Sequence, residues 1–419
     1  MARSGVSLRI SPATSVPISC VLLTLLCASP QIRSAAPAAA PSENWVGTWA
    51  CSPQLSDSSV SPPTPDLSDI TLRQIVHVSI GGTILRVRFS NEFGKAPLTI
   101  TAANIAKSAG TDAIQPGTAK SLTFGDQPSA TVPAGALVYS DLAAFDLLPL
   151  SDLVVTIHIK NAPEGISTHA GSRATSYFTH GEAVSEIKLP NSQPIDHWYF
   201  LTGVDVVGAK ASAAVAILGD SITDGRGSTT NGNGRWPDDL ARRLQSNKHT
   251  KNIGVLNEGI GGNRLLHDGL GPNALARFDR DVIAQSTVRW LVILEGVNDI
   301  GTCKIDCDLD ALASDVIRAY QQLIVRAHSH HIKVYGATIL PFGGAAYATP
   351  DTERARQSVN QWIRTSGWFD AVIDLAAATR DPQNPLKLAP IADSGDHLHP
   401  NDAGYQIMAG SINPKLFSK

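Results

Sequence analysis

The sequence is poor in charge and shows no excess of either sign. Of its 419 residues 17% are charged, and the formal net charge is -3 at pH 7. Proteins that bind nucleic acid present a strongly basic surface to the phosphates, so this balance argues against DNA or RNA as a partner. Hydrophobic residues make up 43%, with 34 glycines and 26 prolines. Such a composition is typical of a soluble globular chain with many turns, long enough for two domains.

No apolar run reaches the roughly 20 residues that a membrane-spanning helix needs. A shorter run, residues 16–27 (VPISCVLLTLLC), follows two early arginines and precedes the small residues 34–36 (SAA). A positive start, a short apolar segment and a small-residue cleavage site are the three parts of a secretory signal peptide. We therefore expect a signal peptide at 1–36 and a linker at 37–43. The mature protein is expected to be secreted or periplasmic, without a membrane span.

Cysteine is scarce, with five residues in the chain, of which two fall within the expected signal peptide. Cys51, Cys303 and Cys307 remain. The last two are close enough in sequence to close a small disulfide loop in an oxidising compartment. A zinc site would need more ligands than the neighbouring sequence offers, so we expect no metal. Cys51 is expected to be a small buried side chain without a partner.

The loop motifs of nucleotide-binding proteins are missing. The glycine cluster at 257–264 (NEGIGGNR) has neither the third glycine of a dinucleotide-binding loop nor the Gly-Lys-Ser/Thr ending of a phosphate loop. We therefore expect no cofactor. The Gly-x-Ser-x-Gly pentapeptide of the α/β-hydrolases does not occur either.

Residues 44–204 have the pattern of short β-strands. Turn residues recur about every ten positions, and no helical period survives across the region. Expected strands are 70–78, 84–89, 98–101, 134–140 and 153–159. The first two flank Gly81-Gly82 and are expected to form a hairpin; Arg86 and Arg88 share one strand face, which we interpret as solvated. The spacing predicts a β-sandwich domain with a jelly-roll-like topology.

Residues 205–419 alternate between apolar strands and helical stretches. Strands are expected at 215–218, 253–256, 290–295, 333–340 and 371–375. Helices are expected from Pro237, over 274–284, 309–328 and 353–365, and after 399–401, with Pro400 in the first turn. Strands separated by helices predict an α/β domain with a parallel sheet covered on both faces. The site of such a sheet lies beyond the carboxyl ends of its strands.

Polar or glycine-rich clusters follow the first three of these strands, and a fourth lies near the C-terminus. Ser221 follows the first strand, and a nucleophilic serine needs a base and an acid that orients the base. Asp396 precedes His399 by three residues and can meet it across one turn, which favours His399 over His397 as the base. Glycine amides such as that of Gly262, and a neutral side-chain amide such as that of Asn298, can stabilise an oxyanion. Each cluster alone could equally be a turn or a helix cap.

Together, these clusters resemble the four blocks of the GDSL (SGNH) hydrolases in order and spacing: Gly219-Asp-Ser-Ile-Thr223, Gly261-Gly262, Gly296-Val-Asn-Asp299 and Asp396-x-x-His399. The resemblance implies a flavodoxin-like three-layer domain and esterase activity. It implies Ser221 as nucleophile, His399 as base and Asp396 as orienting acid. The oxyanion hole would consist of the Ser221 amide, the Gly262 amide and the Asn298 side chain. The Trp-x-x-Thr-Trp motif at 45–49 is similar to the start of the β domain found in an arylesterase/acylhydrolase branch of that family.

We therefore expect a secreted serine ester hydrolase that acts through an acyl-enzyme. Its expected substrates are small acyl groups, acetyl above all, on carbohydrate or aryl esters, either as small molecules or as polysaccharides. Two alternatives remain open: a lipid or thioester acylhydrolase with a wider acyl pocket, and a glycan-binding protein with a degenerate enzyme domain. His169 and Arg173 are expected to border the active site from the first domain.

Overall fold

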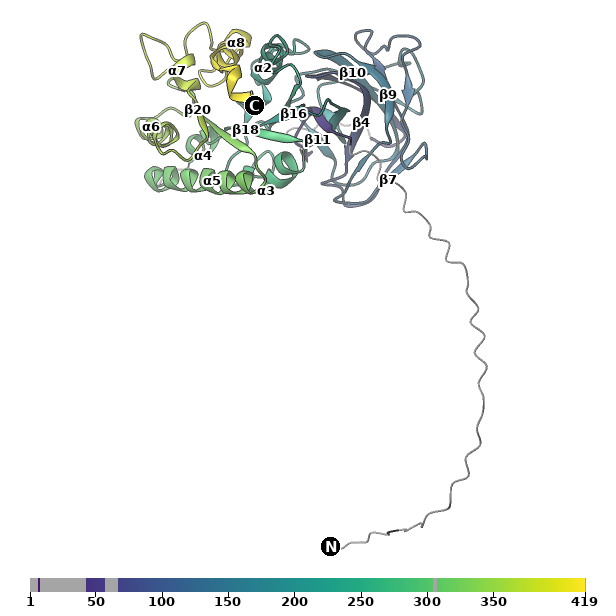
Figure 1. Ribbon diagram of the computed structural model, residues 1–419, viewed down its shortest axis with the longest axis horizontal. Helices are drawn as coiled ribbons and strands as arrows, with labels where there is room; N and C mark the ends of the chain where they lie inside the picture. Colours follow the sequence, from purple (N-terminus) through teal and green to yellow (C-terminus); the bar gives the residue numbers. More distant parts are fainter. Residues whose placement is uncertain (1–6, 8–42, 57–66, 304–306, 419) are drawn as a thin grey trace, which may run out of the picture. The chain divides into compact units, whose positions relative to one another are not determined.

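The computed structural model describes residues 7, 43–56, 67–303 and 307–418. The expected signal peptide, apart from residue 7, and the expected linker up to residue 42 lie outside the described residues. Residues Glu43–Lys419 form one compact unit. Within this unit, strands dominate the first half, and strands alternate with helices in the second (Figure 1).

The described part of the first half contains three antiparallel sheets. The first sheet comprises β1 (Trp45–Ala50), β15 (Leu201–Val207), β4 (Gly82–Ser90), β8 (Leu137–Tyr139) and β9 (Ala143–Leu147). The second comprises β13 (Gln193–Ile195), β12 (Ser176–His180), β3 (Ile70–Val78), β10 (Ser151–Asn161), β5 (Leu98–Lys107), β6 (Lys120–Ser121) and β7 (Ala130–Val132). The third comprises β14 (Trp198–Tyr199), β11 (Ser167–His169) and β2 (Gln54–Leu55). The expected strand-rich first half is thus confirmed, whereas its jelly-roll topology stays a prediction.

The expected hairpin at Gly81-Gly82 is wrong, because β3 and β4 belong to different sheets. After β3 the chain binds to β1 instead of folding back: the Ile80 amide donates to the Thr48 hydroxyl at 2.9 Å. Gly81 is packed so closely that a Cβ there would lie 2.3 Å from the Leu147 carbonyl oxygen. The glycines therefore allow a tight crossing from one sheet to the other.

The interpretation of Arg86 and Arg88 as a solvated face is also wrong. The Arg86 guanidinium donates to the Asp205 carboxylate, and Arg88 is only 5% exposed. Arg88 donates to the Gln285 side chain at 2.8 Å. This face of β4 thus packs against the second half of the chain, and the two arginines bind partners that lie more than a hundred residues away in sequence.

The second half is built on a five-stranded parallel sheet, which confirms the expected α/β architecture. Its spatial order is β17 (Ile253–Gly259), β16 (Ala213–Gly219), β18 (Val288–Leu294), β19 (Lys333–Ala337) and β20 (Ala371–Ile373). Numbered along the chain, this order is 2-1-3-4-5, that of flavodoxin-like doubly wound sheets. In this order the chain reverses direction between the first and third strands, so a ligand crevice is expected where β16 and β18 end.

Helices cover both faces of this sheet (Figure 1). Helices α2 (Trp236–Gln245) and α8 (Asp402–Ser411) pack together on one face, and α5 (Leu309–Ser329) and α6 (Pro350–Thr365) pack together on the other. The shorter elements are α1 (Ser221–Asp224), α3 (Ala274–Phe278), η1 (Asp279–Ile283), α4 (Val297–Gly301), α7 (Leu375–Thr379) and η2 (Pro414–Phe417). Pro237 lies in the first turn of α2, as expected. Pro400 does not lie in the first turn of α8, because the Asn401 side chain caps the helix by accepting from the Gly404 amide.

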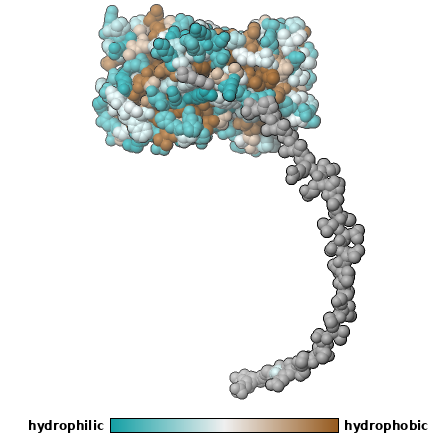
Figure 2. Space-filling model, viewed as in Figure 1, coloured by the Kyte–Doolittle hydropathy of each residue, from teal (hydrophilic) through white to brown (hydrophobic). Residues whose placement is uncertain are grey.

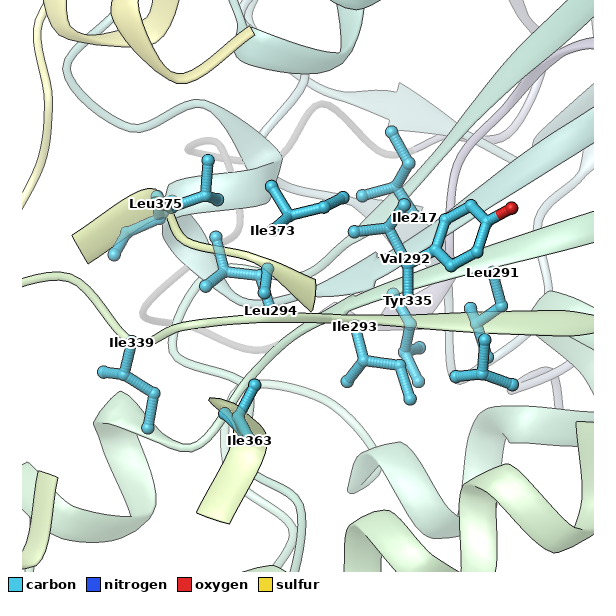
Figure 3. Close-up of a cluster of buried hydrophobic side chains, with 14 of the residues drawn as sticks. Ile217, Leu291, Val292, Ile293, Leu294, Tyr335, Ile339, Ile363, Ile373 and Leu375 are labelled. Carbon is cyan, nitrogen blue, oxygen red and sulfur yellow. The ribbon is translucent and has the colours of Figure 1, made fainter. Parts of the chain in front are cut away.

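The core of the parallel sheet is apolar on both faces. Every residue of β16 is buried, which explains the unbroken apolar run in its sequence. In Figure 3, side chains of β16 and β18 such as Ile217 and Ile293 lie in one cluster with Ile363 and Leu375 from the helices. This packing fixes the ends of β16 and β18, from which the polar clusters extend.

The surface carries polar and apolar side chains interspersed over the face seen in Figure 2. Among the described helices, none is long and apolar enough to cross a membrane.

Candidate active site

Ser221 begins a four-residue helix, α1, directly beyond the end of β16. The Asp220 carboxylate caps this helix by accepting from the Ile222 amide at 2.9 Å. Gly219 has no room for a side chain, since a Cβ there would lie 2.1 Å from the Thr223 hydroxyl. Ser221 is 5% exposed and stands where the strand order predicts a crevice.

Ser221, His399 and Asp396 form a continuous chain of contacts. The Ser221 hydroxyl lies 2.8 Å from His399 Nε2, and His399 Nδ1 lies 2.6 Å from Asp396 Oδ2. Asp396 Oδ1 accepts from the backbone amides of Leu398 and His399. The same carboxylate therefore holds both the ring and the backbone of His399, which fixes the orientation of the imidazole.

The electrostatic environment sets the protonation states of His399 and Asp396. Burial lowers the pKa of His399 below its ordinary value, although the Asp396 carboxylate opposes this shift. Burial would raise the pKa of Asp396, but the hydrogen bonds from His399 and Leu398 outweigh it and hold the pKa at about 2. At neutral pH Asp396 is thus ionised, so it accepts a hydrogen bond from the N–H of His399 Nδ1. His399 Nε2 is then free to accept from the Ser221 hydroxyl.

His397 lies apart from the contacts that join Ser221, His399 and Asp396. Its Nδ1 lies 2.6 Å from Asp393 Oδ2, and its side chain is half exposed. His397 has a left-handed backbone with a φ of 63°, so its side chain departs in a different direction from that of His399. The two neighbouring histidines therefore bind two different carboxylates.

Asn298 lies in α4, just beyond the end of β18, with its side-chain amide held at both ends. Its Nδ2 donates to the Asn263 carbonyl oxygen at 2.9 Å, and its Oδ1 accepts from the Tyr347 hydroxyl at 3.1 Å. A carbonyl oxygen can only accept, so the first contact identifies which atom is nitrogen. Because an amide nitrogen carries two hydrogens, one N–H of Asn298 is left for a further acceptor.

Gly262 lies in the loop after β17 with a φ of 73°, a conformation that favours glycine. The Asp299 carboxylate binds this loop to α4 by accepting from the amides of Leu265 and Leu266. Within the part of the chain that the structure describes, neither Gly262 nor Asn298 hydrogen-bonds directly to Ser221. The loops of the two predicted oxyanion donors are therefore bound to each other, and they follow β17 and β18, the strands on either side of β16.

His169 and Arg173 contact the last residue of α1 from the first half of the chain. His169 Nε2 lies 2.9 Å from Asp224 Oδ1, and its Nδ1 lies 2.9 Å from the Ser52 carbonyl oxygen. Arg173 Nη2 lies 3.5 Å from Asp224 Oδ2. Both residues therefore border the helix of Ser221, as the sequence had led us to expect.

Two residues of the site have no sequence signal. Tyr347 orients Asn298 although 49 positions separate them. Arg277 is fully buried and donates to the carbonyl oxygen of Gly219, the Asn263 side chain and the Ser52 hydroxyl. Neither residue belongs to a recognisable motif, because their roles depend on contacts between distant segments.

Arg277 lies among buried carboxylates. It donates to Asp281 at 3.0 Å and lies 3.4 Å from Glu295. Burial raises the pKa of Glu258 to about 8, and Glu258 accepts from the Ser52 hydroxyl. Removing the guanidinium would leave Asp281 with Arg280 but would take away the only ion-pair partner that Glu295 has among the described residues, and breaking a buried pair costs on the order of 3–5 kcal/mol.

The structure pairs Cys303 with Cys307 in a disulfide, with the two Cα atoms 5.8 Å apart. The bridge begins two residues after the end of α4. Cys51 is free and buried. Among the residues that the structure describes, no group of three or more His, Cys, Asp or Glu side chains could hold a metal ion.

Comparison with known proteins assigns the second half of the chain. Residues 217–407 match the GDSL-like lipase/acylhydrolase family. No curated protein matched the chain. A solved GDSL-like lipase from Bacteroides thetaiotaomicron VPI-5482 is 22% identical, with a TM-score of 0.35, and the match covers 48% of this chain and 86% of that one. A solved acetylxylan esterase from Geobacillus stearothermophilus is 22% identical, with a TM-score of 0.37, and the match covers 48% and 94%.

Proposed function

For this carboxylic ester hydrolase with a GDSL-like lipase/acylhydrolase domain at residues 217–407, we propose a reaction through an acyl-enzyme on Ser221. The observation that carries the proposal is the chain of contacts from Ser221 through His399 to Asp396. A serine hydroxyl is a weak nucleophile until a neighbouring base takes its proton, and this chain supplies the base together with the acid that orients it.

In the first step, Ser221 Oγ attacks the ester carbonyl carbon while its proton passes to His399 Nε2. The carbonyl oxygen becomes an oxyanion in a tetrahedral intermediate. The intermediate collapses as His399 returns the proton to the departing alcohol oxygen, which leaves the acyl group on Ser221. Asp396 stays ionised throughout and stabilises the imidazolium that forms in between.

In the second step, a water molecule replaces the alcohol. His399 takes one proton from the water while the water oxygen attacks the carbonyl carbon of the acyl-enzyme. The new tetrahedral intermediate expels Ser221 Oγ, which regains a proton from His399, and the carboxylic acid is released. The net reaction consumes one ester and one water and yields one alcohol and one acid.

The oxyanion is proposed to accept from the second Nδ2 hydrogen of Asn298 and from the amides of Gly262 and Ser221. Asn298 suits this role because Tyr347 and the Asn263 carbonyl fix its amide before substrate arrives. A preorganised donor needs no reorganisation at the transition state, and losing one such donor typically costs about 10²–10³ in kcat.

We propose small acyl groups, acetyl above all, on carbohydrate or aryl esters as the substrates. This proposal rests on the resemblance of the Trp-x-x-Thr-Trp motif at 45–49 to the start of the β domain in an arylesterase/acylhydrolase branch of the family. It also rests on the signal peptide that we expect at residues 1–36, because an enzyme that is secreted or periplasmic meets polysaccharide esters outside the cytoplasm.

The test is a chain-length series of 4-nitrophenyl esters from acetyl to decanoyl, combined with acetate release from acetylated polysaccharides. Preference for acetyl supports the proposal, whereas preference for decanoyl indicates a lipid or thioester acylhydrolase. Ser221→Ala should lose about four to six decades of kcat with an unchanged melting temperature. Turnover within tenfold of wild type in that variant would show that another group is the nucleophile. Glycan retention without any ester turnover by wild type would favour the glycan-binding alternative.

A further inference from the structure

Three arginines lie on three segments that adjoin the proposed catalytic groups. Arg173 comes from the first half of the chain and contacts Asp224 in the helix of Ser221. Arg226 follows that helix, and its amide donates to the Ser221 carbonyl oxygen at 2.9 Å. Arg264 lies two residues after Gly262.

The guanidinium of Arg264 lies against the helix of Asn298. It donates to the Thr302 hydroxyl at 3.4 Å, and that hydroxyl donates to the Asn298 carbonyl oxygen. Its other contact is with the backbone oxygen of Asp268, while the Asp268 carboxylate accepts from Asn273. Arg264 thus has hydrogen-bond partners, but among the described residues no carboxylate lies within ion-pair distance of it.

Arg226 has still fewer partners. Its side chain is exposed, and among the described residues it makes no hydrogen bond or ion pair. Its backbone lies between two parts of the site, because the Tyr405 hydroxyl donates to its carbonyl oxygen and a Cβ on Gly227 would lie 2.4 Å from the Pro400 carbonyl oxygen. Arg226 therefore lies beside the loop of His399.

Arg173 is only partly neutralised. Its nearest carboxylate oxygen, on Asp224, is 3.5 Å away, and that carboxylate also binds His169 at 2.9 Å. The Nε of Arg173 is buried without a hydrogen-bond partner, and its backbone has a left-handed φ of 49°. Strained backbones in non-glycine residues gather at functional sites. The positive charges of Arg226 and Arg173 also help burial to lower the pKa of His399.

The other carboxylates around the site are committed to donors that are not these arginines. Asp396 binds His399, Asp393 binds His397, and Asp402 accepts from Thr229. Asp299 accepts from backbone amides of the glycine loop. Among the described residues, only Arg173 of these three arginines lies within ion-pair distance of a carboxylate, at 3.5 Å from Asp224, so their positive charges favour an anion supplied from outside.

We propose that this site selects esters whose alcohol part carries a carboxylate, which Arg173, Arg226 and Arg264 bind. The inference rests on the proposed function: because the acyl group proposed there is a neutral acetyl, the negative charge must lie in the alcohol part. The guanidinium fork matches a carboxylate in shape and can bind it through two parallel hydrogen bonds. A uronate unit of an acetylated polysaccharide and a free aryl carboxylate share this chemistry.

The test compares two isosteric aryl acetates, 4-acetoxybenzoate and 4-acetoxybenzamide, which differ in one negative charge. We expect wild type to favour the benzoate in kcat/KM, after correction for spontaneous hydrolysis. Arg226→Gln and Arg264→Gln should each lower the benzoate-to-benzamide ratio by about threefold to tenfold, as for charge-assisted bonds at a partly exposed site. Arg226→Lys keeps the charge but not the fork, so it should lower the ratio less than Arg226→Gln does, and added salt should reduce the ratio in wild type.

The matched control is Arg289→Gln, which removes the same charge at the amino end of β18, whereas the proposed site lies beyond the carboxyl ends of the strands. It should leave the ratio unchanged. Arg173→Gln should lower the ratio as well; if that variant fails to fold, the Arg226 and Arg264 variants still decide. Acetate release from acetylated polygalacturonate is then compared with release from acetylated xylan. Faster release from the polygalacturonate indicates a polymeric uronate as the source of the charge, and no difference indicates a small aryl acid.

A wild-type ratio at or below one, or a ratio that none of the three substitutions lowers, would overturn the inference. Ser221→Ala separates this outcome from failure of the proposed function. If wild type cleaves both acetates and Ser221→Ala cleaves neither, the esterase assignment holds and only the charge selection is wrong. If Ser221→Ala cleaves them as fast as wild type, the proposed function itself fails.

Discussion

The sharpest test of the oxyanion assignment is the hydrogen bond between Tyr347 and Asn298. Tyr347→Phe removes one hydroxyl and leaves the ring, which packs closely over Gly301. The lost bond is a neutral one of 3.1 Å, and such bonds contribute about 0.5–1.5 kcal/mol. If that energy serves to orient the Asn298 amide, kcat should fall by about two- to twelvefold while KM changes little, because the amide acts mainly on the charged oxygen of the transition state.

A double-mutant cycle decides whether Tyr347 acts through Asn298. Asn298→Ala should cost about 10²–10³ in kcat, and adding Tyr347→Phe to it should cost nothing more. The assay is steady-state hydrolysis of 4-nitrophenyl acetate. Tyr335→Phe is the control, since it also loses a hydroxyl bond, to the Leu416 carbonyl oxygen, but far from the site. Additive losses, or a rise in KM alone, would refute the reasoning and make Tyr347 a residue that binds substrate.

The remaining predictions concern the base and the disulfide. The pH profile of kcat/KM should rise through one ionisation below 6.5, because burial lowers the pKa of His399 and only the neutral imidazole can act as base; a midpoint above 6.5 would contradict this. Asp396→Asn should cost about four decades of kcat. His399→Ala should abolish turnover, whereas His397→Ala should keep most of it, and equal losses would refute the distinction. A non-reduced digest should yield a peptide with Cys303 joined to Cys307, and free thiols there would contradict the pairing.

What could be predicted from the sequence depended on how local the signal was. Asp396 and His399 are three residues apart, so one turn brings them together, and spacing alone was informative. The buried run of β16 predicted both a parallel sheet and the position of Ser221 at its end. These features follow from periodicity and from the geometry of a single turn.

What could not be predicted depends on contacts between distant segments. Gly81-Gly82 suited a hairpin by composition, but the competing hydrogen bond to Thr48 takes the chain into another sheet. Arg88 reads as a solvated residue until the second half of the chain supplies Gln285 as its partner. Tyr347 shows the same limit within the site, because nothing near it in sequence indicates that its hydroxyl reaches Asn298.

The position of Ser221 depends on both halves of the chain. A helix of four residues has too few hydrogen bonds of its own to hold a fixed position. Before it, the Gly219 carbonyl oxygen accepts from the buried Arg277, and Arg277 also donates to Ser52. At its end, Asp224 lies against His169, whose other nitrogen contacts the Ser52 carbonyl oxygen. Both anchors of the helix lead to Ser52 in the first half of the chain, so the strand-rich region helps to fix the position of the nucleophile.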